Sequence, residues 1–313
     1  DATKGWIPVS DDAVTDAPSP PPTQRALFGY GEIGGAVSMT NLVNSSGVVA
    51  ADVTGVGTAR YYLAATGYGG DKAIFGYGST GSNSSLTNLV NNSGVVAADT
   101  TGVGTARWGL GAANYGNDKA IFGYGTTGSV SSITNKVSNS GVVATDTTGV
   151  GTARRNPAAT SYGGDKAIFG YGLNSSTTRV SMTNLVNNSG VVATDTTGVG
   201  SARYGLAAAS YGGDKAIFGY GITTGDADSW VNMTNLVSNT GVVAADVTGV
   251  GTRRYYLAAA GYGGDKAIFA YGRSGSEVSL KNLVSNSGVV AADVTGVGTA
   301  RDILAAAGYS FSA

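Results

Sequence analysis

The sequence predicts an all-β protein in which six copies of one repeat close into a ring. The repeat is recognised from the segment 71–78, Asp-Lys-Ala-Ile-Phe-Gly-Tyr-Gly. This segment returns nearly unchanged at 118–125, 165–172, 214–221 and 265–272, and in a looser form at 24–31. Composition agrees, since 51 glycines and only 12% charged residues favour short strands with tight turns over long helices. A fixed period has to be interpreted first, because it determines the whole architecture.

Each repeat contains four short β-prone segments separated by turns rich in glycine or asparagine. In one full repeat these segments are 63–68, 72–77, 86–90 and 95–99. Short runs of this kind between such turns are predicted strands. Four strands in the 47 residues from Lys72 to Lys119 match one blade of a β-propeller.

The two ends of the chain predict how the ring closes. The chain enters the pattern at a second strand, near 25–28, and leaves it on a first strand at 303–309. Neither end is a whole repeat, but together they make one, whereas an open solenoid would need atypical capping repeats. We therefore predict a six-bladed β-propeller over residues 25–313, with four-stranded blades and one blade split between the N- and C-terminal ends.

Residues 1–24 stand outside the repeats as an extended, proline-rich leader. Trp6 and Ile7 supply apolar groups that suit attachment to another structural subunit. The leader is therefore predicted to be an attachment arm, and the alternative is a disordered segment.

Several side chains recur in every copy and are predicted to be structural. The phenylalanine of the repeated segment should fill the space between neighbouring blades. An asparagine that shares a face with apolar residues should be buried and hydrogen-bonded. The recurring aspartate and arginine should link blades through charge-assisted hydrogen bonds rather than form six active sites. These positions are Phe28, Phe75, Phe122, Phe169, Phe218 and Phe269; Asn41, Asn88, Asn135, Asn184, Asn235 and Asn282; Asp52, Asp99, Asp146, Asp195, Asp246 and Asp293; and Arg60, Arg107, Arg154, Arg203, Arg254 and Arg301.

Missing residue types exclude many functions. The chain has no cysteine and no histidine, which excludes thiolate and histidine nucleophilic chemistry and the usual transition-metal ligands. Nineteen basic and twenty acidic residues leave no basic stripe for nucleic acid. No apolar run is long enough to cross a membrane. We expect no cofactor, no metal, no nucleic-acid partner and no membrane insertion.

The repeats differ from one another in two places. One is the loop between the second and third segments, and the other is the residue pair after the fixed arginine. Because strands alternate in direction, both places should lie on one face of the ring, which we call the variable face. Function tends to lie on loops held by a rigid scaffold. The candidate ligand-binding residues on this face are Tyr61, Tyr62, Trp108, Arg155, Arg179, Tyr204, Asp226, Asp228, Trp230, Tyr255, Tyr256 and Arg273. The alternative is sequence drift on an unconstrained surface.

The repeat resembles that of kelch-type propellers. The resemblance is carried by Arg107, by the alanine-rich segment after it, and by the segment 118–125, in which Gly-Tyr-Gly replaces the kelch glycine doublet. Propellers of the regulator-of-chromosome-condensation type are a neighbouring possibility. Kelch-like oxidases hold copper with histidine, tyrosine and cysteine, and this chain lacks two of those three. Near-identical repeats with low charge also resemble proteins of bacteriophage particles, such as tail appendages.

These observations favour a non-enzymatic structural and adhesion module of a virion or another extracellular assembly, with the variable face as its binding surface. A free glycan-binding propeller lectin, whose partner is a cell-surface glycan, is the alternative. A carboxylate-based glycoside hydrolase is third, because only a few acidic residues are not repeated: Glu32, Asp226, Asp228, Glu277 and Asp302.

Overall fold

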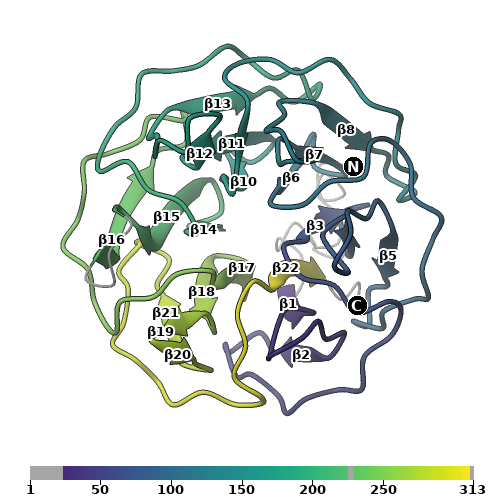
Figure 1. The fold of residues 1–313 in the computed structure, drawn as a ribbon. Helices are drawn as coiled ribbons and strands as arrows, with labels where there is room; N and C mark the ends of the chain where they lie inside the picture. The colour runs from purple at the N-terminus through teal and green to yellow at the C-terminus, as the bar shows by residue number, and fades with distance from the viewer. Residues whose placement is uncertain (1–23, 225–228, 311–313) are drawn as a thin grey trace, which may run out of the picture.

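The protein is an all-β ring of small antiparallel sheets (Figure 1). The computed structural model describes residues 24–224 and 229–310, and within these ranges there is no helix. Six of the sheets have three strands each, and two further sheets are two-stranded ribbons. The predicted arm residues Trp6 and Ile7, and the predicted face residues Asp226 and Asp228, lie outside the described residues.

Each three-stranded sheet has an inner strand near the ring axis, a middle strand and an outer strand. The inner strands are β3 (Ala64–Tyr68), β6 (Gly111–Tyr115), β10 (Ala158–Tyr162), β14 (Ala207–Tyr211), β17 (Ala258–Tyr262) and β22 (Ala305–Ser310). The middle strands are β1 (Gln24–Gly29), β4 (Lys72–Gly76), β7 (Lys119–Gly123), β11 (Lys166–Gly170), β15 (Lys215–Ile222) and β18 (Lys266–Ala270). The outer strands are β2 (Thr40–Val43), β5 (Thr87–Val90), β8 (Thr134–Val137), β13 (Thr183–Val186), β16 (Trp230–Val237) and β21 (Lys281–Val284). The ribbons pair β9 (Arg154–Arg155) with β12 (Leu173–Asn174), and β19 (Arg273–Ser274) with β20 (Ser276–Glu277).

The prediction that the chain ends complete one sheet is confirmed. Strand β1 pairs with β2 on one side and with the C-terminal strand β22 on the other, with Leu27 opposite Ala307. Inner strands of successive sheets contact one another all the way round, and β22 contacts both β17 and β3. The ring is therefore closed by strands from opposite ends of the chain.

The prediction of a fourth strand in each repeat is wrong. In the second repeat the segment 95–99 and the residue after it form no continuous ladder with β5. They make only isolated bridges with it, Thr87 to Thr100 and Val90 to Val96, and a few further hydrogen bonds such as that from the Ala97 N–H to the Leu89 carbonyl. Of this segment only Val96 is buried, while Ala97, Ala98 and Asp99 are exposed. With so little apolar surface to bury, and with the Asp99 carboxylate held by Thr58 of the preceding connection, the segment follows the rim instead of extending the ladder.

The phenylalanines fill the space between sheets, as predicted. All six are fully buried, and each lies against the preceding sheet. A Cβ built on Gly76 would lie 2.7 Å from Cζ of Phe122, so the glycine that ends the middle strand is required by the close approach of the next sheet. Phe122 also packs on Tyr77, with ring centroids 5.1 Å apart.

The tyrosine of each Gly-Tyr-Gly turn has a left-handed backbone, which is uncommon for a residue other than glycine. Tyr77 has φ of 64°, and the other five tyrosines have φ of 62–67°. Three contacts offset this backbone cost. The Tyr77 ring packs on Phe122, its hydroxyl donates to the carbonyl of Val103 at 3.0 Å, and the Arg107 guanidinium lies 4.5 Å from its centroid. Burial raises the pKa of the Tyr77 hydroxyl to about 12, although Arg107 opposes the shift.

The recurring asparagines, aspartates and arginines form one network per sheet junction, as predicted, with the asparagine and arginine buried and the aspartate at the surface. Asp146 accepts hydrogen bonds from the backbone and hydroxyl of Thr105, and from Nδ2 of Asn135 at 2.9 Å. The Asn135 oxygen in turn accepts from the buried guanidinium of Arg107 at 2.8 Å. Partial burial alone would raise the pKa of Asp146, but these hydrogen bonds outweigh it and hold the pKa below 3.8. Thr105 and Asp146 belong to successive repeats, so each network ties one sheet to the next.

Candidate functional site

The variable face is formed where the two variable segments of each repeat meet. Isolated bridges join the residue after the fixed arginine to the loop between middle and outer strands, as in Tyr61 with Ser79 and Trp108 with Thr126. The equivalent bridge in the split repeat joins Glu32 to Asp302. The prediction that both variable segments emerge on one face is therefore confirmed.

At the axis, this face is closed by backbone. The second residue after each fixed arginine has a left-handed backbone, with φ between 51° and 64°. Five of these residues donate their N–H to the carbonyl of the equivalent residue in the preceding repeat, at 2.6–3.1 Å. The ring consists of Tyr62, Gly109, Asn156, Gly205, Tyr256 and Ile303. These six residues, with the leucine or proline that follows each of them, line a pocket of about 80 Å³.

The predicted aromatic residues stack into one continuous cluster across this axial ring. Their centroid separations are 5.2 Å for Trp230 with Tyr255, 5.1 Å for Tyr255 with Tyr256, 5.3 Å for Tyr256 with Tyr62, 4.7 Å for Tyr62 with Trp108, 5.7 Å for Tyr61 with Tyr62, and 6.2 Å for Tyr204 with Tyr256. Two predicted arginines cap the cluster: Arg155 lies 5.5 Å from the Trp108 ring and Arg179 lies 5.5 Å from the Tyr204 ring. Burial raises the pKa of Tyr62 to about 12.

None of the predicted face residues is fully exposed within the described part of the chain. All ten are half-buried, because each packs on a neighbour from the same set or from the adjoining loop. The cluster is thus a rigid platform that offers ring edges and polar groups to solvent, not a set of free aromatic side chains.

A groove of about 400 Å³ opens beside this platform, along the longest hairpin of the ring. One wall carries Trp230 and Asn232 of β16, and the other carries Arg253. Trp230 is held by its stack on Tyr255, and Asn232 by a hydrogen bond from its Nδ2 to the carbonyl of Gly251 at 2.6 Å. An aromatic ring, an amide and a cation therefore converge on one open space.

Arg253 was missed by sequence reasoning. It stands at a position that holds alanine in every other repeat: Ala59, Ala106, Ala153, Ala202 and Ala300. Its guanidinium is exposed and makes no hydrogen bond or ion pair within residues 24–224 and 229–310. A comparison of the six repeats could have found Arg253, because it is the one residue at this position that is not alanine. It was missed because the segment around it otherwise repeats closely.

Three of the unrepeated acidic residues come together on the same face, around Arg273. The Arg273 guanidinium lies 2.9 Å from the Glu277 carboxylate and 3.7 Å from that of Asp302, while Glu32 bridges to Asp302 through the backbone. The Asp302 side chain is only 3% exposed. Burial raises the pKa of Asp302 to about 6, with Arg273 opposing the shift and Glu277 and Glu32 adding to it. A substrate has almost no access to this carboxyl, so the cluster is better suited to linking neighbouring repeats, as a structural joint, than to catalysis.

The raised pKa predicts how this joint responds to pH. A carboxyl whose pKa rises from 3.8 to about 6 on folding stabilises the fold when protonated, so its contribution is complete below about pH 4 and is lost as the pH rises through 6. We expect Asp302→Asn to gain roughly 2–3 kcal/mol of stability relative to the parent chain between pH 4 and pH 8. Denaturant unfolding of both proteins across this range gives the difference between their free energies of unfolding. The other carboxyl groups are present in both proteins, so their effects cancel in this difference. A difference that does not change with pH would contradict the assignment.

Within the described residues, no group of three or more carboxylates is arranged to hold a metal ion. The same residues include no helix long and apolar enough to cross a membrane. No protein-family model matches the chain, and no match is found among curated proteins. The kelch-like and virion resemblances therefore stay predictions.

Proposed function

We propose that this chain is a six-bladed β-propeller that acts as a non-enzymatic adhesion module, binding a glycan through the groove of its variable face. The observation that carries the proposal is the convergence of Trp230, Asn232 and Arg253 on one groove. Binding sites combine an apolar surface with a few placed polar groups. An aromatic ring can cover the apolar face of a sugar, while an amide and a guanidinium supply hydrogen bonds to its hydroxyl or carboxylate groups.

The scaffold supports this role. A closed ring of sheets holds the loops in place, and the stacked aromatic cluster fixes Trp230 before any ligand arrives. Preorganisation of this kind reduces the entropic cost of binding. The loop that carries Trp230 is the longest of its kind, and Arg253 stands where the other repeats have alanine, so the groove is specific to one repeat.

In this proposal the chain is part of a virion or another extracellular assembly, joined to its neighbouring subunits through an arm that ends at residue 23, because Gln24, predicted as the last residue of the arm, begins strand β1. A free lectin is the second candidate, since the same groove would serve it equally well. Deleting residues 1–23 separates the two. An arm is supported if the shortened protein keeps its glycan binding but no longer enters its assembly.

We expect Arg253→Ala and Trp230→Ala each to weaken glycan binding by about tenfold or more, which corresponds to about 1.4 kcal/mol. Arg253→Ala restores the alanine of the other five repeats, so loss of the fold is not expected. A glycan array with the full chain identifies hits, and calorimetry on those hits gives the affinities. Lys119→Ala, which removes an exposed side chain of the opposite face, is the matched control. The groove is the wrong site if Arg253→Ala and Trp230→Ala both bind the hits as the parent does.

A further inference from the structure

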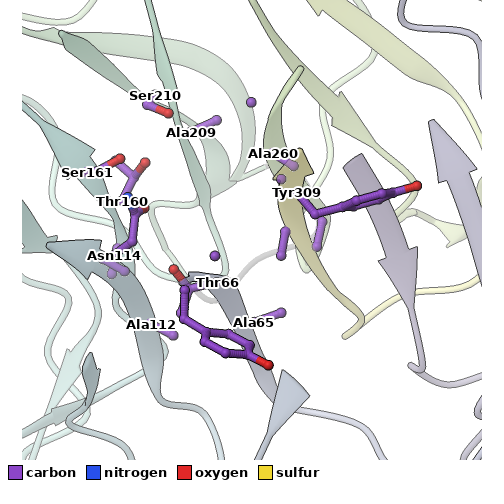
Figure 2. Close-up of a pocket in the computed structure, with 18 of the residues that line it drawn as sticks. Ala65, Thr66, Ala112, Asn114, Thr160, Ser161, Ala209, Ser210, Ala260 and Tyr309 are labelled. Atoms are coloured by element: carbon purple, nitrogen blue, oxygen red, sulfur yellow. The ribbon is translucent and has the colours of Figure 1, made fainter. Parts of the chain in front are cut away.

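The opposite end of the ring axis holds a second site. Here the inner strands surround a cavity of about 110 Å³ (Figure 2). A second cavity of about 160 Å³ adjoins it. Gln24, Asn114, Ser161 and Ser210 line both cavities. Gly164, Gly213 and Gly264 also line the second cavity, so this space borders the turns of the face opposite the variable face.

The wall of this space breaks the symmetry of the repeats. At the fourth position of the inner strand, three successive repeats carry Asn114, Ser161 and Ser210, whereas the other three carry glycine. At the third position, Thr66 and Thr160 replace the alanine of the other copies. Asn114, Ser161 and Ser210 line the cavity from the successive inner strands β6, β10 and β14, and Thr66 lines it from β3 (Figure 2).

These polar groups have no partner inside the protein. Thr66 is 5% exposed and Thr160 is 7% exposed, and neither hydroxyl makes a hydrogen bond within the described residues. The side chains of Asn114, Ser161 and Ser210 likewise make none within that part of the chain. Asn114, Ser161 and Ser210 are half-buried and line the cavity, so their donors and acceptors are available to a molecule that occupies it.

The glycine side of the cavity has a complementary feature. A Cβ built on Gly308 would lie 2.8 Å from Nε2 of Gln24, so glycine there leaves room for the Gln24 amide to reach over the axis. The Gln24 backbone is fixed by a hydrogen bond from the Gly263 N–H to its carbonyl at 2.8 Å. An amide on one side therefore faces an amide and hydroxyls on the other.

The charges around the mouth balance. Lys72 pairs with Asp71 at 2.6 Å, and Lys215 pairs with Asp214 at 2.7 Å. The equivalent lysines of the other full repeats also pair with the aspartate before them. In the split repeat Arg25 follows a glutamine instead of an aspartate, but Arg25 does not line either cavity. Each lysine that lines the cavities therefore lies next to its own anion, which leaves no uncompensated lysine charge in the lining to attract an anion.

We propose that this axial cavity binds one small, neutral, polyhydroxylated molecule, of the class of a monosaccharide or a short polyol. Hydroxyl groups both donate and accept, so such a molecule can pair with amides and hydroxyls at once. The space is far smaller than a drug-sized pocket, which limits the ligand to one ring or a few carbons. This site does not depend on the groove of the variable face.

The test uses the full chain and saturation-transfer NMR with five probes: erythritol, D-glucose, N-acetylglucosamine, and the charged sugars glucosamine and glucuronate. We expect at least one neutral probe to bind, and to bind more tightly than either charged probe. The variant carrying Asn114→Gly, Ser161→Gly and Ser210→Gly restores the residue of the other three repeats, and should weaken binding by about tenfold or more. Asn114→Gly alone serves if the triple variant does not fold.

Trp230→Ala is the control, since it alters the other face and should leave this binding unchanged. The proposal is overturned if no neutral probe binds the full chain, if a charged probe binds more tightly, or if the glycine variants bind as the parent does. A crystal structure at saturating probe that holds only ordered water in the cavity would also overturn it.

Discussion

Removing residues 304–313 is expected to abolish the cooperative unfolding transition of the chain. The deletion takes away β22, which pairs with β1 along six positions and lies between the inner strands β17 and β3. It also removes the buried side chains of Leu304 and Tyr309 from two core clusters. The loss of these contacts, together with an exposed edge on β1, exceeds what a domain of ordinary stability can tolerate.

Thermal unfolding followed by circular dichroism measures this effect. A synthetic peptide of residues 304–313, added to the shortened protein, should restore the transition by pairing with β1, and a scrambled peptide should not. Deletion of residues 311–313 alone is the control, because β22 ends at Ser310. A shortened chain that melts like the parent would mean that the ring does not depend on its closing strand.

Truncating Phe122 to alanine is expected to lower the free energy of unfolding by about 3–5 kcal/mol. Phe122 has no exposed surface, and it fills the space between its own sheet and the sheet of β4, against Gly76 and Tyr77. Both neighbours are constrained, Gly76 by close approach and Tyr77 by its left-handed backbone, so the cavity left behind cannot collapse easily.

Urea denaturation gives the free energy, and the equivalent Phe169→Ala should lose a similar amount, since its surroundings are nearly the same. Val95→Ala, at a side chain that is 60% exposed, should change stability by no more than about 0.5 kcal/mol. A loss below about 1 kcal/mol at Phe122 would show that the sheets do not depend on this packing.

The two proposed sites lie on opposite faces of the ring. On the variable face, backbone from all six repeats closes the axis, and the groove lies to one side between Trp230 and Arg253. Toward the other face lies the axial cavity, which is lined by Asn114, Ser161 and Ser210. Each site arises where one or a few repeats depart from the common sequence, because a perfectly repeated ring would present the same surface six times.

The sequence by itself determined the repeat and its strands. Inner, middle and outer strands lie where the β-prone segments predicted them, with boundaries shifted by a residue or so, as for β4 at Lys72–Gly76. It also determined the closing pair β1 and β22, the buried phenylalanines, and the network of Asn135, Asp146 and Arg107. These features could be predicted because six copies act as an internal alignment, and a position kept in all of them must satisfy the same packing each time.

Only the tertiary structure decided the rest, because it depends on contacts between repeats. The fourth segment is no strand, since its aspartate is held by the neighbouring repeat. The aromatic residues of the variable face stack on one another instead of standing free, because the axis brings the six copies together. Contacts with residues far away in the sequence decide the role of Arg253, the burial of Asp302 and the polar lining of the axial cavity. A local sequence pattern does not show such contacts.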